Sequence, residues 1–359
     1  MEVGVRDSEE LLRLIYGALV GAGIDLDAVD EVLEFSCEQM SDPSRRARHV
    51  WQVNFWRAVE QVSGDPDIGV HLCPHLPLFR NSAIEYLFLS CKTFGQACRL
   101  ALRYDRLISD AFHGEVYIED GVGVARITGT NGSDSILRHS EVCFVYGVID
   151  FLAHMTQGAF VAERVHLCCD PGLARDDYER TFACPVSFGE TSSEIRFDAE
   201  LFDLESAYHN PEMLAIHREH ADREVTNLKS QDTIDRLRSA IMRRLPGSEG
   251  VDIELDDIAG DVGDNGRHVR SELAAAGTSF RKLVQSVRFH MACRLLSHSG
   301  AATEAIADLL GFSGERAFRR AFKSLSGLTP SEYRKMERLD RHALKDPYEL
   351  LSRMIEIDS

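Results

Sequence analysis

The stretch from Gly311 to Arg334 constrains the fold of this chain most, because its side chains divide cleanly between two faces. With about 100° of rotation per residue of helix, the apolar residues after Gly314 share one arc and the charged residues share the opposite arc. The apolar arc holds Ala317, Phe318, Ala321 and Phe322, and the charged arc holds Glu315, Arg316, Arg319, Arg320 and Lys323. This pattern predicts an amphipathic helix that docks on a core and leaves a basic face free for a partner.

The flanking residues predict a helix on either side of this one. The segment 303–310 has Thr303 as its expected N-cap and an apolar face, and Gly311 supplies the left-handed residue that ends a helix. Ser313 is expected to cap the basic helix. The run Thr329-Pro330-Ser331-Glu332 has the form of a capping box with proline at the first helical position. The sequence therefore predicts three short helices separated by tight turns.

The basic face has the chemistry of a surface that binds nucleic acid. Arginine pairs bidentately with guanine, glutamate accepts a hydrogen bond from cytosine, and both arginine and lysine bind phosphates. A helix, a glycine turn and a second, basic helix together predict a DNA-reading helix-turn-helix unit. The basic face alone is also compatible with an ordinary solvated amphipathic helix of an α-helical domain.

The surrounding residues distinguish these two interpretations, because they resemble the C-terminal signature of the AraC/XylS family of bacterial transcription regulators. The matching positions are Ala307, Gly311, Phe312, Ser313, Phe318, Phe322, Lys323, Gly327, Thr329, Pro330, Tyr333 and Arg334. The resemblance implies an all-α DNA-binding domain with two helix-turn-helix units joined by a long linker helix. It also implies double-stranded promoter DNA and RNA polymerase as partners.

A second helix-turn-helix unit is predicted upstream of the first. A short helix over 255–263 ends in glycine, and Asn265 can cap a helix over 266–276. The departures from the family pattern are Asp264, Gly266 and Glu272, of which Glu272 is expected to weaken phosphate contact. By family position, the residues expected to face DNA are Arg267, His268, Arg270, Ser271, Glu315, Arg316, Arg319, Arg320 and Lys323.

Between the two units, residues 280–298 have apolar residues at helical spacing. A helix of this length spans about 28 Å. The resemblance implies that this linker helix holds the two recognition helices roughly 34 Å apart, in successive major grooves of DNA.

The distribution of charge agrees with a small DNA-reading module on an acidic body. The whole chain has a net charge of −18. Residues 232–339 contain 17 Lys and Arg and 15 Asp and Glu, so their net charge is +2 and the rest of the chain carries −20. The acidic part is expected to repel DNA while the C-terminal face attracts it.

The N-terminal part is predicted to form an α+β domain. Helical spacing of apolar residues occurs in 11–19, 51–62 and 94–108, and a β-hairpin is predicted in 116–127 with its turn at Asp120-Gly121. Further strands are expected in 161–167, 185–188 and 194–197. The expected division is a sensor and dimerisation domain over 1–225, a linker over 226–231, a DNA-binding domain over 232–339 and a tail over 340–359.

This part is similar to the sensor domain of the AraC subgroup that is called arabinose-binding-like. The similar landmarks are Gly64–Gly69, Thr93–Ala97, Arg103-Tyr104, Tyr178–Phe182 and Pro185–Phe188. The resemblance implies an activator that is controlled by a small-molecule effector, whose identity the sequence leaves open. Polar residues near apolar elements are candidates to touch it: Arg80, Tyr104, His113, Arg138 and His139. The segment 204–224 is a candidate helix for homodimer formation.

The sequence gives only weak indications of a metal site or a redox-active cysteine pair. His71, Cys73 and His75 are expected on one face of a strand, and His217 and His220 on a helix, but neither set has the spacing of a metal site, so no metal or cofactor is expected. Cys168-Cys169 is a candidate redox pair if one thiol has a lowered pKa.

The sequence also lacks the signatures of several protein classes. No nucleophile elbow, phosphate-binding loop or dinucleotide fingerprint is present, so an enzyme is not expected. The chain has no long apolar run, its first residues are acidic, and its nine cysteines are scattered, so a cytoplasmic protein outside membranes is expected. Two alternatives stay open: an effector-independent dimeric regulator, and a small-molecule binding protein or enzyme with a vestigial DNA-binding domain.

Overall fold

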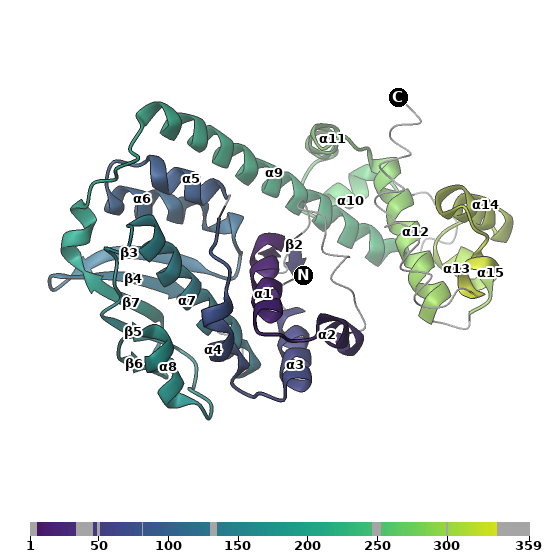
Figure 1. Ribbon diagram of the computed structural model, residues 1–359. Coiled ribbons are helices and arrows are strands. Elements are labelled where there is room, and N and C mark those ends of the chain that lie inside the picture. The colour runs from purple at the N-terminus through teal and green to yellow at the C-terminus, as the bar shows by residue number, and fades with distance from the viewer. Residues whose placement is uncertain are drawn as a thin grey trace. The chain divides into compact units, whose positions relative to one another are not determined.

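A computed structural model describes most of the chain, and its residues divide into two compact units at Thr226 and Asn227 (Figure 1). The described residues are 6–33, 46–48, 51–80, 82–129, 135–245, 253–298 and 301–335. The N-terminal unit mixes helices with a sheet and the C-terminal unit is helical, which confirms the predicted fold class.

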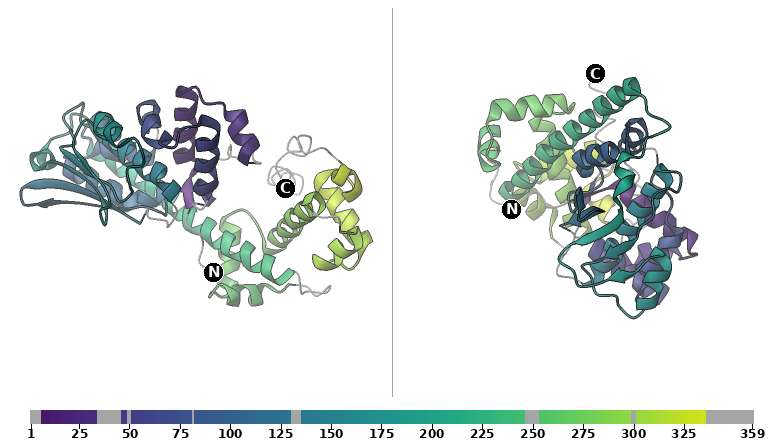
Figure 2. Two further views of the ribbon diagram at one scale, coloured as in Figure 1. Left: turned by 90° about the horizontal axis from the view of Figure 1, so that it is seen from below. Right: turned by 90° about the vertical axis from the view of Figure 1, so that its left-hand side faces the viewer.

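The N-terminal unit contains two sheets and several helices. In chain order its elements are β1 (Arg6–Ser8), α1 (Glu9–Gly21), α2 (Leu26–Leu33), β2 (Arg46–Arg48), α3 (Trp51–Ser63), α4 (Ile68–Leu72), η2 (Cys73–His75), α5 (Ala83–Ser90), α6 (Phe94–Ala101), η3 (Leu102–Leu107), β3 (His113–Glu119), β4 (Val122–Thr128), η4 (Ser135–Leu137), α7 (Arg138–Met155), β5 (Arg164–His166), α8 (Arg175–Phe182), β6 (Val186–Ser187), β7 (Ser193–Asp198), η5 (Ala199–Asp203) and the first part of α9 (Pro211–Arg244). In the left view of Figure 2, the purple and dark-blue helices of α1, α2 and α3 form a group beside the larger sheet.

The larger sheet has five strands in the order β3-β4-β7-β5-β6. Strand β7 is antiparallel to both β4 and β5, while β6 is parallel to β5. The predicted hairpin is confirmed, with His113 opposite Thr128 at one end and Glu119 opposite Val122 at the other. Its turn residues Asp120 and Gly121 have φ of 50° and 81°, the positive values that a two-residue hairpin turn with Asp-Gly requires.

Helix α7 fixes the sheet to the rest of the N-terminal unit through a buried carboxylate. Glu141 is 4% exposed. Its Oε1 accepts hydrogen bonds from Ser193 Oγ at 2.5 Å and from the Cys168 backbone N–H at 2.6 Å, and its Oε2 accepts one from the Cys169 N–H at 3.1 Å. One side chain on α7 thus holds both the start of β7 and the segment after β5.

Several sequence predictions for this unit are corrected by the structure. The helix expected over 94–108 is α6 followed by the 3-10 helix η3, with a break in helical geometry at Tyr104 (φ −119°, ψ 17°). The strand expected at 71–75 is helical instead, as the end of α4 and η2. The segment 204–224 becomes helical only at Pro211, because Asn210 Oδ1 caps the helix by accepting from the N–H groups of Glu212 and Met213.

The C-terminal unit consists of the rest of α9, α10 (Leu255–Asp261), α11 (Gly266–Ala275), α12 (Phe280–His298), α13 (Thr303–Leu309), α14 (Glu315–Ser326) and α15 (Pro330–Lys335). Residues 226–231, predicted to be a linker between the domains, are helical and lie inside α9. The expected tail, 340–359, lies outside the described residues. Within the described part of the chain, no helix is both long enough and apolar enough to span a membrane.

We expect the substitution Glu141→Gln to destabilise the N-terminal unit by about 1–3 kcal/mol, because an amide NH₂ would replace one acceptor oxygen facing buried donors. Urea unfolding followed by tryptophan fluorescence measures this unit, since both tryptophans, Trp51 and Trp56, lie in it. The exposed Glu163→Gln is the matched control and should change the midpoint little. Equal midpoints for the two variants would contradict a structural role for the Glu141 carboxylate.

Candidate nucleic-acid interface

The described residues of the C-terminal unit form two hydrophobic cores, one under each helix-turn-helix pair. The first core contains Leu237 and Ile241 of α9, residues of α10 and α11, and the first part of α12, including Leu283. The second core contains residues of α13 and α14 and the second part of α12, including Phe289 and Leu296. Figure 1 shows α12 running between α10 and α11 on one side and α13, α14 and α15 on the other. One helix therefore supports both pairs.

Helix α14 packs by the apolar face that the sequence predicts. Phe318 and Phe322 are 1% and 2% exposed, and the Phe322 ring lies 5.2 Å from that of Phe289 on α12 and 5.4 Å from that of Tyr333 on α15, measured between centroids. These contacts fix the rotation of α14 about its axis. The opposite face, which carries the predicted DNA-contacting residues, is consequently held toward solvent.

The turns around α14 depend on glycine at two positions. Gly314 occupies the N-cap with φ 140°, a backbone conformation that L side chains rarely adopt, so the prediction of Ser313 as the cap is wrong. Gly327 ends the helix with φ 75° and donates its N–H to the carbonyl of Lys323 at 2.9 Å. The predicted Thr303 cap is also wrong, because Ala302 has the extended backbone of an N-cap and Thr303 is the first helical residue.

The capping box at the start of α15 is confirmed. The Thr329 N–H donates to Glu332 Oε2 at 2.7 Å, and the Glu332 N–H donates to Thr329 Oγ1 at 3.3 Å. These bonds to Thr329 lower the pKa of the Glu332 carboxyl. Arg334 donates to the backbone carbonyl of Ala301 at 2.6 Å, so this family-signature residue ties α15 to the chain before α13.

The charged residues of α14 differ in whether they form ion pairs within the protein. Arg319 donates from Nε to Glu315 Oε1 at 3.0 Å, which is an i,i+4 ion pair along the helix. Arg316, Arg320 and Lys323 are exposed. Among the described residues, Arg316 and Arg320 have no ion-pair partner within 4.0 Å. Two guanidinium groups are therefore available to an approaching anion without the loss of an internal pair.

Helix α11 presents the second set of predicted residues. Asn265 Oδ1 accepts from the His268 N–H at 2.9 Å, which confirms the predicted cap. Val269 and Leu273 are buried, and all four predicted DNA-contacting residues of α11 are exposed: Arg267, His268, Arg270 and Ser271. The helix starts in close contact with α10, since a Cβ on Gly266 would lie 1.8 Å from Asp256 Oδ1. This close contact accounts for glycine at a position that departs from the family pattern.

His268 lies between two carboxylates on the exposed side of α11. Its Nδ1 is 2.8 Å from Asp264 Oδ2, and its Nε2 is 3.8 Å from Glu272 Oε1. The Asp264 carboxylate, helped by Glu272, raises the pKa of His268. Glu272 also accepts a hydrogen bond from Ser230 Oγ on α9 at 3.0 Å, so its charge is partly engaged within the unit.

In the N-terminal unit, the polar residues proposed to touch an effector are each bonded to other side chains. Arg80 contacts His154, Tyr104 donates to Asp222, and His113 contacts Asp105. Arg138 and the buried His139 both contact Glu60, at 2.9 and 2.8 Å. Burial lowers the pKa of His139. None of these five proposed residues lines the apolar pocket of the unit.

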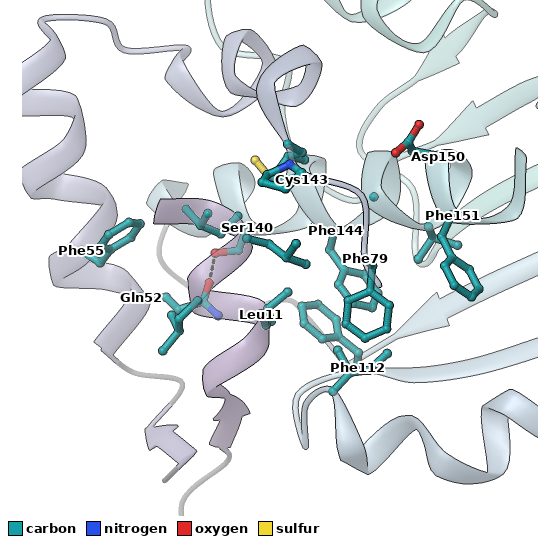
Figure 3. Close-up of a pocket in the computed structure, with 18 of the residues that line it drawn as sticks. Leu11, Gln52, Phe55, Phe79, Phe112, Ser140, Cys143, Phe144, Asp150 and Phe151 are labelled. Atoms are coloured by element: carbon teal, nitrogen blue, oxygen red, sulfur yellow. Dashed lines mark hydrogen bonds between the residues drawn. The ribbon is translucent and has the colours of Figure 1, made fainter. Parts of the chain in front are cut away.

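That pocket was not predicted from the sequence. It has a volume of about 100 Å³ and is lined mainly by apolar residues of α1, α3 and α7 and of the segments between them (Figure 3). Its signal in the sequence is only the apolar face of each helix, which looks the same whether the face closes on a core or on a cavity.

The residues considered for a metal site and for a redox pair have neighbours that favour neither role. His71 lies between Asp65 Oδ2 at 2.6 Å and Asp177 Oδ2 at 2.9 Å, and these carboxylates raise its pKa against the effect of burial. Within the described ranges, no group of three or more His, Cys, Asp or Glu side chains is placed to hold a metal ion. Burial and the nearby Glu141 raise the pKa of the Cys169 thiol, the opposite of the shift that a reactive thiolate needs.

The chain matches two family models. Residues 23–206, just over half of the chain, match the N-terminal arabinose-binding domain of AraC transcription regulators. Residues 258–336 match a helix-turn-helix domain that spans both helix pairs.

Curated relatives are transcription regulators by name. The chain is 24% identical over 344 residues to the ornithine utilization regulator of Pseudomonas aeruginosa, covering 92% of this chain and 96% of the relative. It is 28% identical over 157 residues to the HTH-type transcriptional regulator VirS of Mycobacterium tuberculosis, covering 44% and 45% of the two chains. Among solved structures, the transcriptional regulator CdpR of Pseudomonas aeruginosa is 20% identical with a TM-score of 0.41, covering 87% of this chain and 96% of CdpR.

The division into two cores yields a prediction about local stability. We expect Phe322→Ala to destabilise the second core by about 3–5 kcal/mol, because it removes a buried ring from between α12 and α15. Amide hydrogen exchange of the full chain, read by mass spectrometry, should then be faster in 303–335 than in 255–275. The exposed Arg316→Ala on the same helix is the control, and equally faster exchange in both helix pairs would contradict separate cores.

Proposed function

Because the chain belongs to the AraC family of transcription regulators, we propose that it is a sequence-specific activator that binds promoter DNA through α11 and α14. A small-molecule effector bound in the N-terminal unit controls this binding. The observation that carries the proposal is the fixed orientation of α14, whose buried Phe318 and Phe322 leave its basic face toward solvent.

In this proposal, the nine exposed or half-exposed residues on α11 and α14 divide by chemistry. Arg316 and Arg320 read base edges or bind phosphates, and Lys323 binds phosphate near the end of its helix. Glu315 is paired with Arg319 in the absence of DNA, and opening this pair would let each side chain contact a base. Phosphate contacts then supply affinity and base contacts supply specificity.

Partners beyond DNA are proposed from the family. An activator contacts RNA polymerase at the promoter and acts in the cytoplasm, where the DNA is. Met213 and Ile216 on α9 are exposed apolar residues, 40% and 56%, and support homodimer formation through this helix. Arabinose and ornithine, which appear in the names of the family model and of one relative, serve as polar comparators in tests for an effector.

Two alternative functions predict different experimental results. An effector-independent dimeric regulator would bind its promoters equally well with and without any metabolite. A small-molecule binding protein or enzyme with a vestigial DNA-binding domain would select no DNA sequence at all. The exposed arginines Arg316 and Arg320 favour the DNA-binding function over this second alternative.

The test is selection of genomic DNA fragments by the full-length protein without added ligand, followed by sequencing. The expected result is a recurrent motif with two half-elements about one helical turn of DNA apart. Genes beside the enriched fragments, assayed with and without the regulator, would separate activation from repression. Absence of any enriched motif, with and without candidate effectors, would overturn the proposal.

Substitutions on α14 should separate specificity from general affinity. We expect Arg316→Ala to cost about 1–3 kcal/mol on the selected site and to relax the base preference at one position. Lys323→Ala should weaken binding to all sequences alike and lower the dependence on salt. Fluorescence anisotropy with specific and scrambled duplexes measures both effects. Arg180→Ala in the N-terminal unit is the control, and unchanged binding by all three variants would refute the assignment of α14.

DNA affinity should depend on pH through His268. Because Asp264 raises the pKa of this exposed imidazole, His268 carries a positive charge at lower pH and loses it as pH rises through the raised pKa. A cation on α11 attracts phosphate, so affinity for the selected DNA should fall from about pH 6 to about pH 8. His268→Gln should remove most of this fall in an anisotropy titration. The same pH dependence in parent and variant would contradict a position of His268 near the DNA.

A further inference from the structure

The pocket of the N-terminal unit is built almost entirely from apolar side chains. Six of its wall residues are aromatic: Phe55, Trp56, Phe79, Phe112, Phe144 and Phe151. Two of these, Phe112 and Phe144, stack with ring centroids 4.0 Å apart and an interplanar angle of 4°. Figure 3 shows the rings of Phe79, Phe112 and Phe144 gathered on one side of the pocket and Phe55 on the other. The pocket therefore offers ring faces and edges on opposing walls.

Two polar side chains of the wall, Gln52 and Ser140, are already hydrogen-bonded to each other and to neighbouring groups. Gln52 donates from Nε2 to the buried Asp7 at 2.7 Å and accepts from the hydroxyl of Ser140, which in turn accepts from Trp56 Nε1 at 2.6 Å (Figure 3). The carboxylate of Asp150 points away from the phenylalanine rings in Figure 3. A sugar or an amino acid entering here would lose its hydrogen bonds to water and gain few in return, which is costly for each polar group.

Helix α7 leaves space for an occupant at Gly147. A Cβ at this position would have no neighbour within 4 Å among the described residues outside its own stretch of helix backbone. Glycine inside a helix is unfavourable relative to alanine, and here it lies in the middle of an 18-residue helix. The missing side chain enlarges the pocket, whose volume of about 100 Å³ compares with an apolar cavity of about 150 Å³ that binds benzene.

From these observations, we propose that the pocket binds an uncharged, apolar small molecule, and that this molecule is the effector of the regulator. Its buried part is no larger than a single ring or a short alkyl chain. The role of this molecule as effector rests on the proposed function. Its apolar chemistry rests only on the residues that line the pocket. The proposed ligand differs in chemistry from arabinose, the polar sugar after which the matching family model is named.

The pocket contains its own reporter. Trp56 lines the pocket, is 1% exposed and is one of only two tryptophans in the chain. A molecule that enters the pocket contacts the indole and changes its emission. A ligand that binds the folded unit and not the unfolded chain also raises the melting temperature of the unit.

The experiment titrates the full-length protein with toluene and 1-hexanol, and with arabinose and ornithine as polar comparators, while tryptophan emission and melting temperature are recorded. The expected result is a saturable change in emission and a higher melting temperature with at least one apolar probe and with neither polar compound. Binding of a polar compound in competition with toluene, or no saturable binding of either apolar probe, would overturn the inference.

Substitutions at Gly147 locate the binding site. Gly147→Phe fills the pocket and should weaken binding of the apolar probe by about tenfold or more, whereas Gly147→Ala adds one methyl group and should keep most of it. If Gly147→Phe fails to fold, Phe79→Ala provides the second variant. It removes a half-buried ring from the wall and should raise the affinity for the larger probe naphthalene above that of the parent. Parental affinity for the apolar probe in folded Gly147→Phe, or parental affinity for naphthalene in Phe79→Ala, would place the probe elsewhere and overturn the inference.

DNA selection in the same preparations keeps the two proposals distinct. A DNA motif selected by a protein that binds no apolar probe would leave the proposed function intact and refute the pocket inference. Probe binding without any DNA motif would refute the proposed function and leave the binding chemistry standing. Probe binding that changes the affinity for the selected motif, and does so less in Gly147→Phe, is the result expected if both hold.

Discussion

The C-terminal unit depends on the sharing of one helix, α12, between two small cores. Each helix-turn-helix pair has too little apolar surface to bury a core by itself, and small cores are marginally stable. Leu283 and Val287 of α12 complete the first core, while Phe289 and Leu296 complete the second. Because both pairs pack on one continuous helix, the positions of α11 and α14 are tied to each other. Under the proposed function, this shared support suits two helices that enter adjacent grooves of DNA.

The same packing decides which charged side chains stabilise the fold and which are exposed to a partner. On α14, buried Phe318 and Phe322 determine which side of the helix faces outward, so Arg316 and Arg320 project into solvent. Arg334 bonds to the backbone and serves the fold instead, although the family signature includes it equally. The net charge of −18 for the chain is thus compatible with DNA binding, because the relevant field is that of one exposed face.

In the N-terminal unit, one helix, α7, contacts both the larger sheet and the apolar pocket. One face of α7 holds the sheet through Glu141, and another face lines the apolar pocket with Phe144, Gly147 and Phe151. Helix α9 crosses the boundary between the units along the chain, with Ala221 in the N-terminal core and Leu237 in the first C-terminal core. An occupant of the pocket would touch α7, the helix on which the packing of the N-terminal unit depends.

The sequence by itself determined the features that depend on residues a few positions apart. These are the two faces of α14, the Asp120-Gly121 turn, the Asn265 cap and the Thr329–Glu332 capping box, because helix periodicity and turn geometry are local. Tertiary structure decided which residues far apart in the chain contact one another. His139 is fixed by Glu60, 79 residues away, so it serves the fold and does not line the pocket. The pocket itself, and the break of the helix near Tyr104, arise only when separate elements pack together, since an apolar side chain carries no mark of whether it will face a core or a cavity.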